Sequence, residues 1–205
     1  LVLVHGDTTT ALAAALAAFH LRIPVGHVEA GQRSFDLDRP WPEELNRVAV
    51  DAMADLLFAP TERAATNLLA EYRARGRILV TGNTGIDALL AMEARLSRDS
   101  ALAARVASAL PAFDPAKRLV LVTAHRRESQ GAGLGRICEA VAAIAARGDV
   151  EIAWPLHNNP AVRGPVLRAL AWRPCVHLLE PLDPAAMVFL LRRAAIVLTL
   201  SLIHI

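Results

Sequence analysis

The sequence predicts an α/β fold made of two domains, each built on a doubly wound parallel sheet. Three observations support this prediction. Short apolar runs alternate with helical patterns, and the runs are too apolar for half-exposed antiparallel strands. The alternation is interrupted once, between residues 83 and 118. Polar side chains follow several predicted strands, at the sheet edge where open α/β sheets place their binding sites.

The first predicted domain covers residues 1–82. Its strands are expected at residues 1–4, 23–30, 55–59 and 77–80, and its helices at residues 8–22, 42–54 and 61–73. Pro42 suits the first turn of a helix, and Glu43 and Glu44 suit the positive end of the helix dipole. Thr61 is a suitable N-cap for the third helix. Strands that alternate with helices favour right-handed crossovers and hence a parallel sheet.

The second predicted domain covers residues 119–205, after linking helices within residues 83–118. The linking helices are expected at residues 86–96 and 101–110, and the sequence PAFDPAKR then breaks the helical pattern. The strands of this domain are expected at residues 119–124, 150–156, 175–180 and 195–200, and its helices at residues 134–147, 161–171 and 184–193. The alternation predicts a second parallel sheet.

Composition narrows the class of protein. The chain has 205 residues, 54% of them hydrophobic and 20% charged, which is enough to bury a core. The net charge of +2 argues against a nucleic-acid-binding surface, and no apolar run reaches the roughly 18 residues of a membrane span. Cys138 and Cys175 lack metal-ligand spacing and are expected to be free thiols in a reducing cytoplasm. The chain starts inside a strand-like run without methionine and ends on LSLIHI, so we expect a fragment with both domains incomplete.

Residues 28–47 contain the highest concentration of side chains that could take part in catalysis. Glu29 ends an apolar strand beside a glycine, and a carboxylate at the edge of a core suits acid/base work. A structural, hydrogen-bonded role for Glu29 remains the alternative. Asp7, in the turn after the first strand, is either a second such carboxylate or an N-cap. Glu43 could simply complement the helix dipole, and Glu44 is expected to do only that.

A second set of polar side chains follows strands of the second domain. His125, Arg126 and Arg127 have the chemistry to hold a phosphate, although a solvated basic turn is the alternative. His157 follows the next strand. Neither GxGxxG nor GxxxxGK[ST] is present, so a dinucleotide or P-loop site has no motif support. Polar groups at matching strand ends of both sheets predict a cleft between the domains.

Four motif groups together resemble the non-hydrolysing UDP-N-acetylglucosamine 2-epimerases. They are HGDTTT (5–10), HVEAGQRS with PWPEELNR (27–34 and 40–47), TGNTGIDAL (81–89), and VTAHRRES with PLHNNP (122–129 and 155–160). The resemblance runs in order from Leu1 to about Thr199. It implies two Rossmann-like domains in the GT-B arrangement and a cytoplasmic enzyme for bacterial surface polysaccharides. It further implies interconversion of UDP-GlcNAc and UDP-ManNAc, no cofactor or metal, and a homodimer.

The resemblance also implies roles for individual residues. The reaction removes UDP and the C2 proton to give 2-acetamidoglucal, and UDP then adds back with protonation at the opposite face. Asp7, Glu29 and Glu43 are the implied acid/base carboxylates. His125 would act on the diphosphate leaving group. The remaining implied substrate contacts are Arg126, His157 and Ser201.

Several departures from the family pattern limit what this chain can do. The family's basic GTRPE-type turn would precede Leu1, and only Ser201 matches its acidic-Ser-Gly-Gly turn. Met187 stands where an aromatic side chain near the nucleotide base is expected. We therefore expect the 205-residue chain itself to be inactive. An epimerase of another UDP-2-acetamido sugar, a hydrolysing epimerase and a non-catalytic fragment remain open, and a GT-B glycosyltransferase ranks lower.

Overall fold

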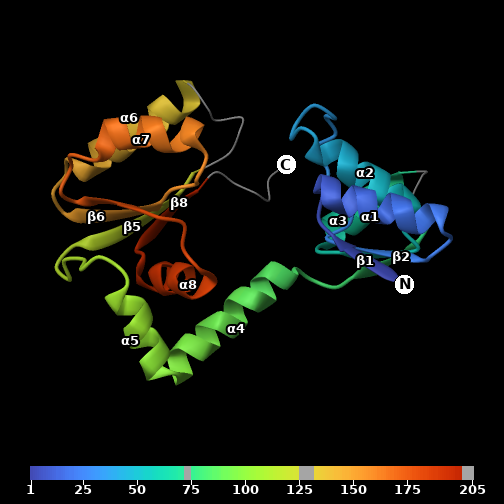
Figure 1. Ribbon diagram of the computed structural model, residues 1–205, viewed down its shortest axis with the longest axis horizontal. Coiled ribbons are helices and arrows are strands. Elements are labelled where there is room, and N and C mark those ends of the chain that lie inside the picture. The colour runs from blue at the N-terminus through green and yellow to red at the C-terminus, as the bar shows by residue number, and fades with distance from the viewer. Residues whose placement is uncertain (72–74, 125–131, 200–205) are drawn as a thin grey trace. The chain divides into compact units, whose positions relative to one another are not determined.

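The computed structural model of the protein describes residues 1–71, 75–124 and 132–199 (Figure 1). The described residues form two compact units, residues 1–85 and residues 86–199. Each unit is built around its own parallel sheet. Within the described ranges, no helix is long and apolar enough to cross a membrane.

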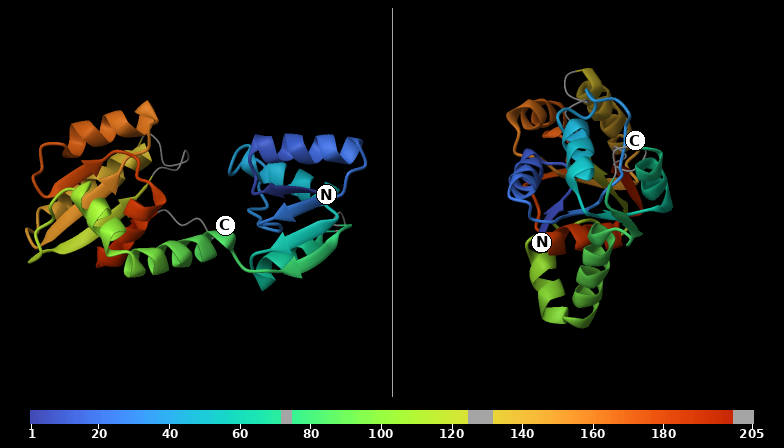
Figure 2. Two further views of the ribbon diagram at one scale, coloured as in Figure 1. Left: turned by 60° about the horizontal axis from the view of Figure 1, so that its bottom comes forward. Right: turned by 90° about the vertical axis from the view of Figure 1, so that its right-hand side faces the viewer.

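The first unit is an alternation of strands and helices. Its elements are β1 (Val2–His5), α1 (Thr9–His20), β2 (Val25–Val28), α2 (Glu43–Met53), β3 (Leu56–Ala59), α3 (Glu62–Ala70) and β4 (Arg77–Val80). The strands lie in the order β1-β2-β3-β4, all parallel. The three helices lie along one face of this sheet (Figure 2), and they share a single hydrophobic core with it. Because all four strands are parallel, their carboxyl ends lie at one edge of the sheet.

The second unit begins with two helices and continues with a second alternation. Its elements are α4 (Thr84–Arg98), α5 (Ser100–Ser108), β5 (Arg118–Thr123), α6 (Ala132–Ala145), β6 (Val150–Pro155), α7 (Pro160–Leu170), β7 (Val176–Leu179), α8 (Pro184–Arg193) and β8 (Ile196–Thr199). The parallel strands lie in the order β7-β6-β5-β8. Helices α6 and α7 cover one face, and α8 covers the other (Figure 1). The strand order therefore reverses beside β5, which makes the gap between β5 and β8 the topological switch point of this sheet.

The predicted α/β class with parallel sheets is confirmed, and the elements differ from expectation mainly at their ends. Strand β2 stops at Val28 rather than residue 30, because Glu29 adopts a positive φ of 74°. Helix α3 stops at Ala70, where Glu71 has an extended backbone. Thr61 caps α3 as predicted, accepting a hydrogen bond from the Ala64 amide. The loop after β2 begins at the first of these ends, and the second lies next to Glu71, which binds Arg33 of that loop. Tertiary contacts therefore set both ends.

Candidate active site

The loop after β2 opens with a backbone conformation that side chains rarely adopt. Glu29 lies in the left-handed region, and the amides of Glu29 and Ala30 both donate to the Phe58 carbonyl, at 3.1 Å each. Gly31 follows with a φ of 82°. A Cβ at Gly31 would lie 2.2 Å from the Ala64 carbonyl oxygen, so only glycine fits there. The chain thus turns sharply off the sheet and onto α3, leaving Glu29 at the carboxyl edge.

The Glu29 carboxylate lies between two neighbouring polar side chains. His5, the last residue of β1, places its Nε2 atom 3.3 Å from Glu29 Oε2. Gln32 donates from its amide nitrogen to Glu29 Oε1 at 2.9 Å. His5 pairs with Val28 in the sheet register, so the ends of β1 and β2 bring the histidine and the carboxylate together. The Glu29 side chain is 33% exposed, which leaves its carboxylate open to a ligand.

Asp7 lies close to Glu29 and Glu43 at the same edge. Burial raises the pKa of the Asp7 carboxyl, the positive charge of Arg47 opposes this rise, and the negative charges of Glu29 and Glu43 reinforce it. Arg47 Nε lies 3.5 Å from Asp7 Oδ2. Asn46 fixes the turn by donating from its side chain to the Asp7 carbonyl at 2.8 Å. The structure therefore gathers the three predicted carboxylates and gives one of them an environment that favours its protonated form.

Glu44 does not merely complement the helix dipole, so that expectation was wrong. Its side chain is buried and accepts hydrogen bonds from the backbone amides of Ser34 and Phe35, at 3.1 and 3.0 Å. Arg47 Nε lies 3.1 Å from Glu44 Oε2, although it is not aligned for a hydrogen bond. Glu44 thus holds the loop against α2, while Glu43, at the first position of the helix, remains half-buried beside the site.

A buried ion-pair network fixes the middle of the loop, and sequence analysis missed it. The Arg33 guanidinium contacts Asp51 of α2 at 2.8 Å and binds Glu71 through two nitrogens. Burial opposes the charge of Arg33, but its hydrogen bonds to Glu71 and the charge of Asp51 leave its pKa raised. Asp51 also accepts from the Gly31 amide at 3.1 Å. The sequence signalled this network only through Asp51, an acidic residue on the apolar face of α2.

The other predicted site residues belong to the second unit or lie outside the described residues. His157 follows β6, and its Nδ1 atom accepts a hydrogen bond from the Asn159 amide at 3.1 Å. His125, Arg126 and Ser201 are not among the described residues. The strands that precede them, β5 and β8, are neighbours, and they pair up to Thr123 and Thr199. Those strand ends flank the switch point, which is where open α/β sheets bind ligands.

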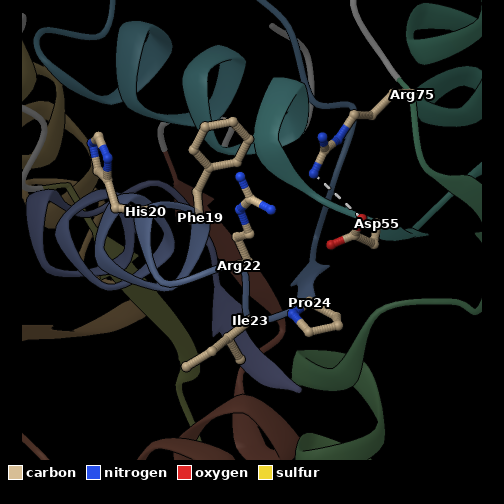
Figure 3. Close-up of a pocket in the computed structure, with 7 residues that line it drawn as sticks. All are labelled: Phe19, His20, Arg22, Ile23, Pro24, Asp55 and Arg75. Atoms are coloured by element: carbon tan, nitrogen blue, oxygen red, sulfur yellow. Dashed lines mark hydrogen bonds and ion pairs between the residues drawn. The ribbon is translucent and has the colours of Figure 1, made fainter.

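The first unit also contains a cavity of about 480 Å³ (Figure 3). It lies between the end of α1 and the starts of β2 and β3, at the amino edge of the sheet. Arg75 closes one side, 3.3 Å from Asp55 and stacked 5.2 Å from the centre of the Phe19 ring. Asp7, Glu29 and Glu43 do not line this cavity. Among the residues that the structure describes, no cluster of His, Cys, Asp or Glu could hold a metal ion.

Comparison with known proteins decides the family. The family model described as UDP-N-acetylglucosamine 2-epimerase matches residues 1–201. The chain belongs to this family. A "Probable UDP-N-acetylglucosamine 2-epimerase" of Ralstonia nicotianae is 52% identical over 200 residues, which are 97% of this chain and 53% of that protein. The UDP-N-acetylglucosamine 2-epimerase of Escherichia coli K12 is 49% identical over 199 residues, with the same coverage.

Solved structures agree with this assignment. The chain is similar to the crystal structure of the Neisseria meningitidis UDP-GlcNAc 2-epimerase bound to UDP-GlcNAc, with a TM-score of 0.92 and 41% identity. The similarity covers 97% of this chain and 54% of that one. The predicted fold class, with Rossmann-like domains of the GT-B type, is therefore confirmed. The chain of this epimerase-family member spans about half the length of the relatives it matches.

Proposed function

We propose that the full-length protein is a non-hydrolysing UDP-GlcNAc 2-epimerase that interconverts UDP-GlcNAc and UDP-ManNAc. The observation that carries this proposal is the group of Asp7, Glu29 and Glu43 at one sheet edge, with the pKa of Asp7 raised. The C2 proton of the sugar has no adjacent carbonyl to acidify it. Its removal therefore has to accompany loss of UDP from C1, and both the removal and the return of a proton need positioned carboxylates.

The proposed reaction is an elimination followed by an addition. One carboxylate removes the C2 proton as the C1–O bond breaks, which gives 2-acetamidoglucal and UDP. UDP then adds back to C1 while a carboxyl group protonates C2 from the opposite face. The steps are redox-neutral. The raised pKa of Asp7 makes it the best candidate to carry a proton, and the partly exposed Glu29 carboxylate beside His5 is the best candidate to accept one.

The diphosphate would be held by residues of the second unit. The proposal assigns His125 to the leaving group and Arg126, His157 and Ser201 to substrate binding. Guanidinium and imidazolium groups stabilise the charge that develops on a departing diphosphate. The switch point between β5 and β8 supports this assignment, because the segments carrying His125 and Ser201 start at the ends of those strands. We further propose a cytoplasmic homodimer for the full-length protein.

The test is incubation of the full-length protein with UDP-GlcNAc in D₂O, followed by NMR of the sugar. A mixture of UDP-GlcNAc and UDP-ManNAc, both deuterated at C2, is the expected result. Release of free ManNAc would replace the proposal with a hydrolysing epimerase. Turnover only with another UDP-2-acetamido sugar would correct the substrate. The 205-residue chain, assayed in parallel, is expected to show no epimerisation, and measurable turnover would contradict that part.

A further inference from the structure

We infer that His27 is a positioning residue, which links the turn that carries Asp7 to the loop that carries Glu29. This inference rests on the proposed function. His27 lies on β2, two residues before Glu29, and its side chain is completely buried. Its Nδ1 atom lies 2.6 Å from Asp51 Oδ1, and its Nε2 atom lies 3.0 Å from the Gly6 carbonyl oxygen. Both ring nitrogens are therefore engaged, one with each side of the site.

Both partners of His27 are hydrogen-bond acceptors. The Gly6 carbonyl can only accept. Asp51 is ionised, because its second oxygen lies 2.8 Å from the Arg33 guanidinium and accepts from the Gly31 amide at 3.1 Å. A neutral imidazole has one N–H and could serve only one of the two acceptors. Two simultaneous hydrogen bonds thus require a doubly protonated, cationic ring.

Charge balance supports a cationic ring in this buried position. Among the residues that the structure describes, the network contains two carboxylates, Asp51 and Glu71, and one permanent cation, Arg33. An imidazolium at His27 supplies the second cation, so that the positive and negative charges are equal. A buried charge without a partner is strongly destabilising, whereas a paired and hydrogen-bonded one is tolerated.

The bridge reaches each of the three carboxylates through the backbone. Gly6 directly precedes Asp7 and has a φ of 69°, so its carbonyl direction sets where the Asp7 turn leaves β1. Glu29 lies between His27 and Gly31, whose amide is held by Asp51. Asp51 belongs to α2, the helix that begins at Glu43. His27 is too deeply buried to touch a substrate, so its effect on the reaction passes through these groups.

The kinetic test uses the full-length protein and two substitutions that each retain one hydrogen bond. In His27→Asn the side-chain amide replaces Nδ1, which keeps the Asp51 contact and removes the donor to Gly6. In His27→Gln the longer amide replaces Nε2 and keeps the donor to Gly6. Because each substitution breaks one half of the bridge and removes the positive charge of the ring, we expect both variants to lower kcat for UDP-GlcNAc about tenfold or more, with KM within about threefold. The exposed His20 supplies the matched control, His20→Asn, which is expected to leave kcat unchanged.

The outcomes separate positioning from general destabilisation. Thermal melts of each variant report the folded fraction, and kcat is normalised to it. An unchanged kcat in either His27 variant, or a loss that the folded fraction accounts for completely, would overturn the inference. A loss of kcat in both variants, at a folded fraction equal to that of His20→Asn, supports it.

A spectroscopic test needs no turnover and is therefore independent of the proposed function. In protein labelled with ¹⁵N-histidine, one ring signal should disappear in His27→Gln, and in the wild type that signal should show two protonated nitrogens. A signal with one unprotonated nitrogen would overturn the charged bridge. If the wild-type protein fails to epimerise UDP-GlcNAc, the proposed function fails, whereas the ring protonation still tests the His27 bridge.

Discussion

Replacing Arg33 with alanine removes the cation that two carboxylates share beneath the loop. The Arg33 side chain is 1% exposed, as is that of Asp51, and the Glu71 side chain is 24% exposed. Breaking a buried ion pair by removing one partner costs about 3–5 kcal/mol, because the remaining charge is left without compensation. Asp51 keeps His27 and the Gly31 amide as partners, and Glu71 can reach water, so the loss should lie at the low end of this range. We therefore expect Arg33→Ala to lower the free energy of unfolding of the first unit by about 3 kcal/mol.

The assay is urea denaturation of the full-length protein, followed by far-UV circular dichroism. With a slope of about 2 kcal/mol per molar urea, a loss of 3 kcal/mol lowers the midpoint of the affected transition by about 1.5 M. Arg75→Ala is the matched control, since Arg75 pairs with Asp55 at 3.3 Å but its side chain is 52% exposed. Exposed pairs contribute about 0–1 kcal/mol, and stacking on Phe19 adds about 0.5–1 kcal/mol. A difference of less than about 1 kcal/mol between the two variants would refute the assigned role of Arg33.

Three further predictions concern the loop and its carboxylates. Glu29→Gln should lower turnover of the full-length protein about 10²-fold while UDP binding, measured by calorimetry, is largely retained; a near-normal rate would remove Glu29 from the mechanism. Gly31→Ala should lower thermal stability clearly more than Gly82→Ala, since both have a φ of 82° but only Gly31 has a neighbour, Ala64, that a Cβ would strike; equal melting temperatures would show that the contact relaxes. Asp7→Asn should raise the melting temperature at pH 7. The pKa of Asp7 is raised in the folded state above its ordinary value of 3.8, so the protonated carboxyl stabilises the fold at low pH and this stability is lost as the group ionises at higher pH; asparagine stays neutral. The gain should vanish below about pH 4, and a less stable variant at pH 7 would contradict the pKa direction.

The sheets were predictable because local sequence signals and tertiary structure agree there. Apolar runs of strand length alternate with helical patterns, and right-handed crossovers leave few ways to connect them. Thr61 shows the same agreement at one residue, since the predicted cap accepts its expected hydrogen bond. The candidate carboxylates could also be placed at a common edge, because parallel strands bring their carboxyl ends together.

The hydrogen bonds and ion pairs that hold the site could not be predicted, because they join residues that are distant in the chain. Arg33 and Glu71 are separated by 38 positions, and no local pattern marks either of them as a partner of the other. Glu44 was assigned to the helix dipole from its position in the first turn, a local signal that its long-range bonds to the loop override. Glu29 was expected to continue a strand, whereas two amides on one carbonyl of β3 impose a left-handed turn.

The left-handed backbone at Glu29 has a consequence for how this position can change. Glycine adopts a φ of 74° without strain, whereas other residues are destabilised there by about 1 kcal/mol or more. Laboratory selection for heat resistance alone would therefore favour glycine at position 29, the substitution that deletes the carboxylate. Retention of glutamate under such pressure requires a simultaneous demand for turnover. At position 29, selection for stability therefore favours glycine, whereas selection for activity favours glutamate.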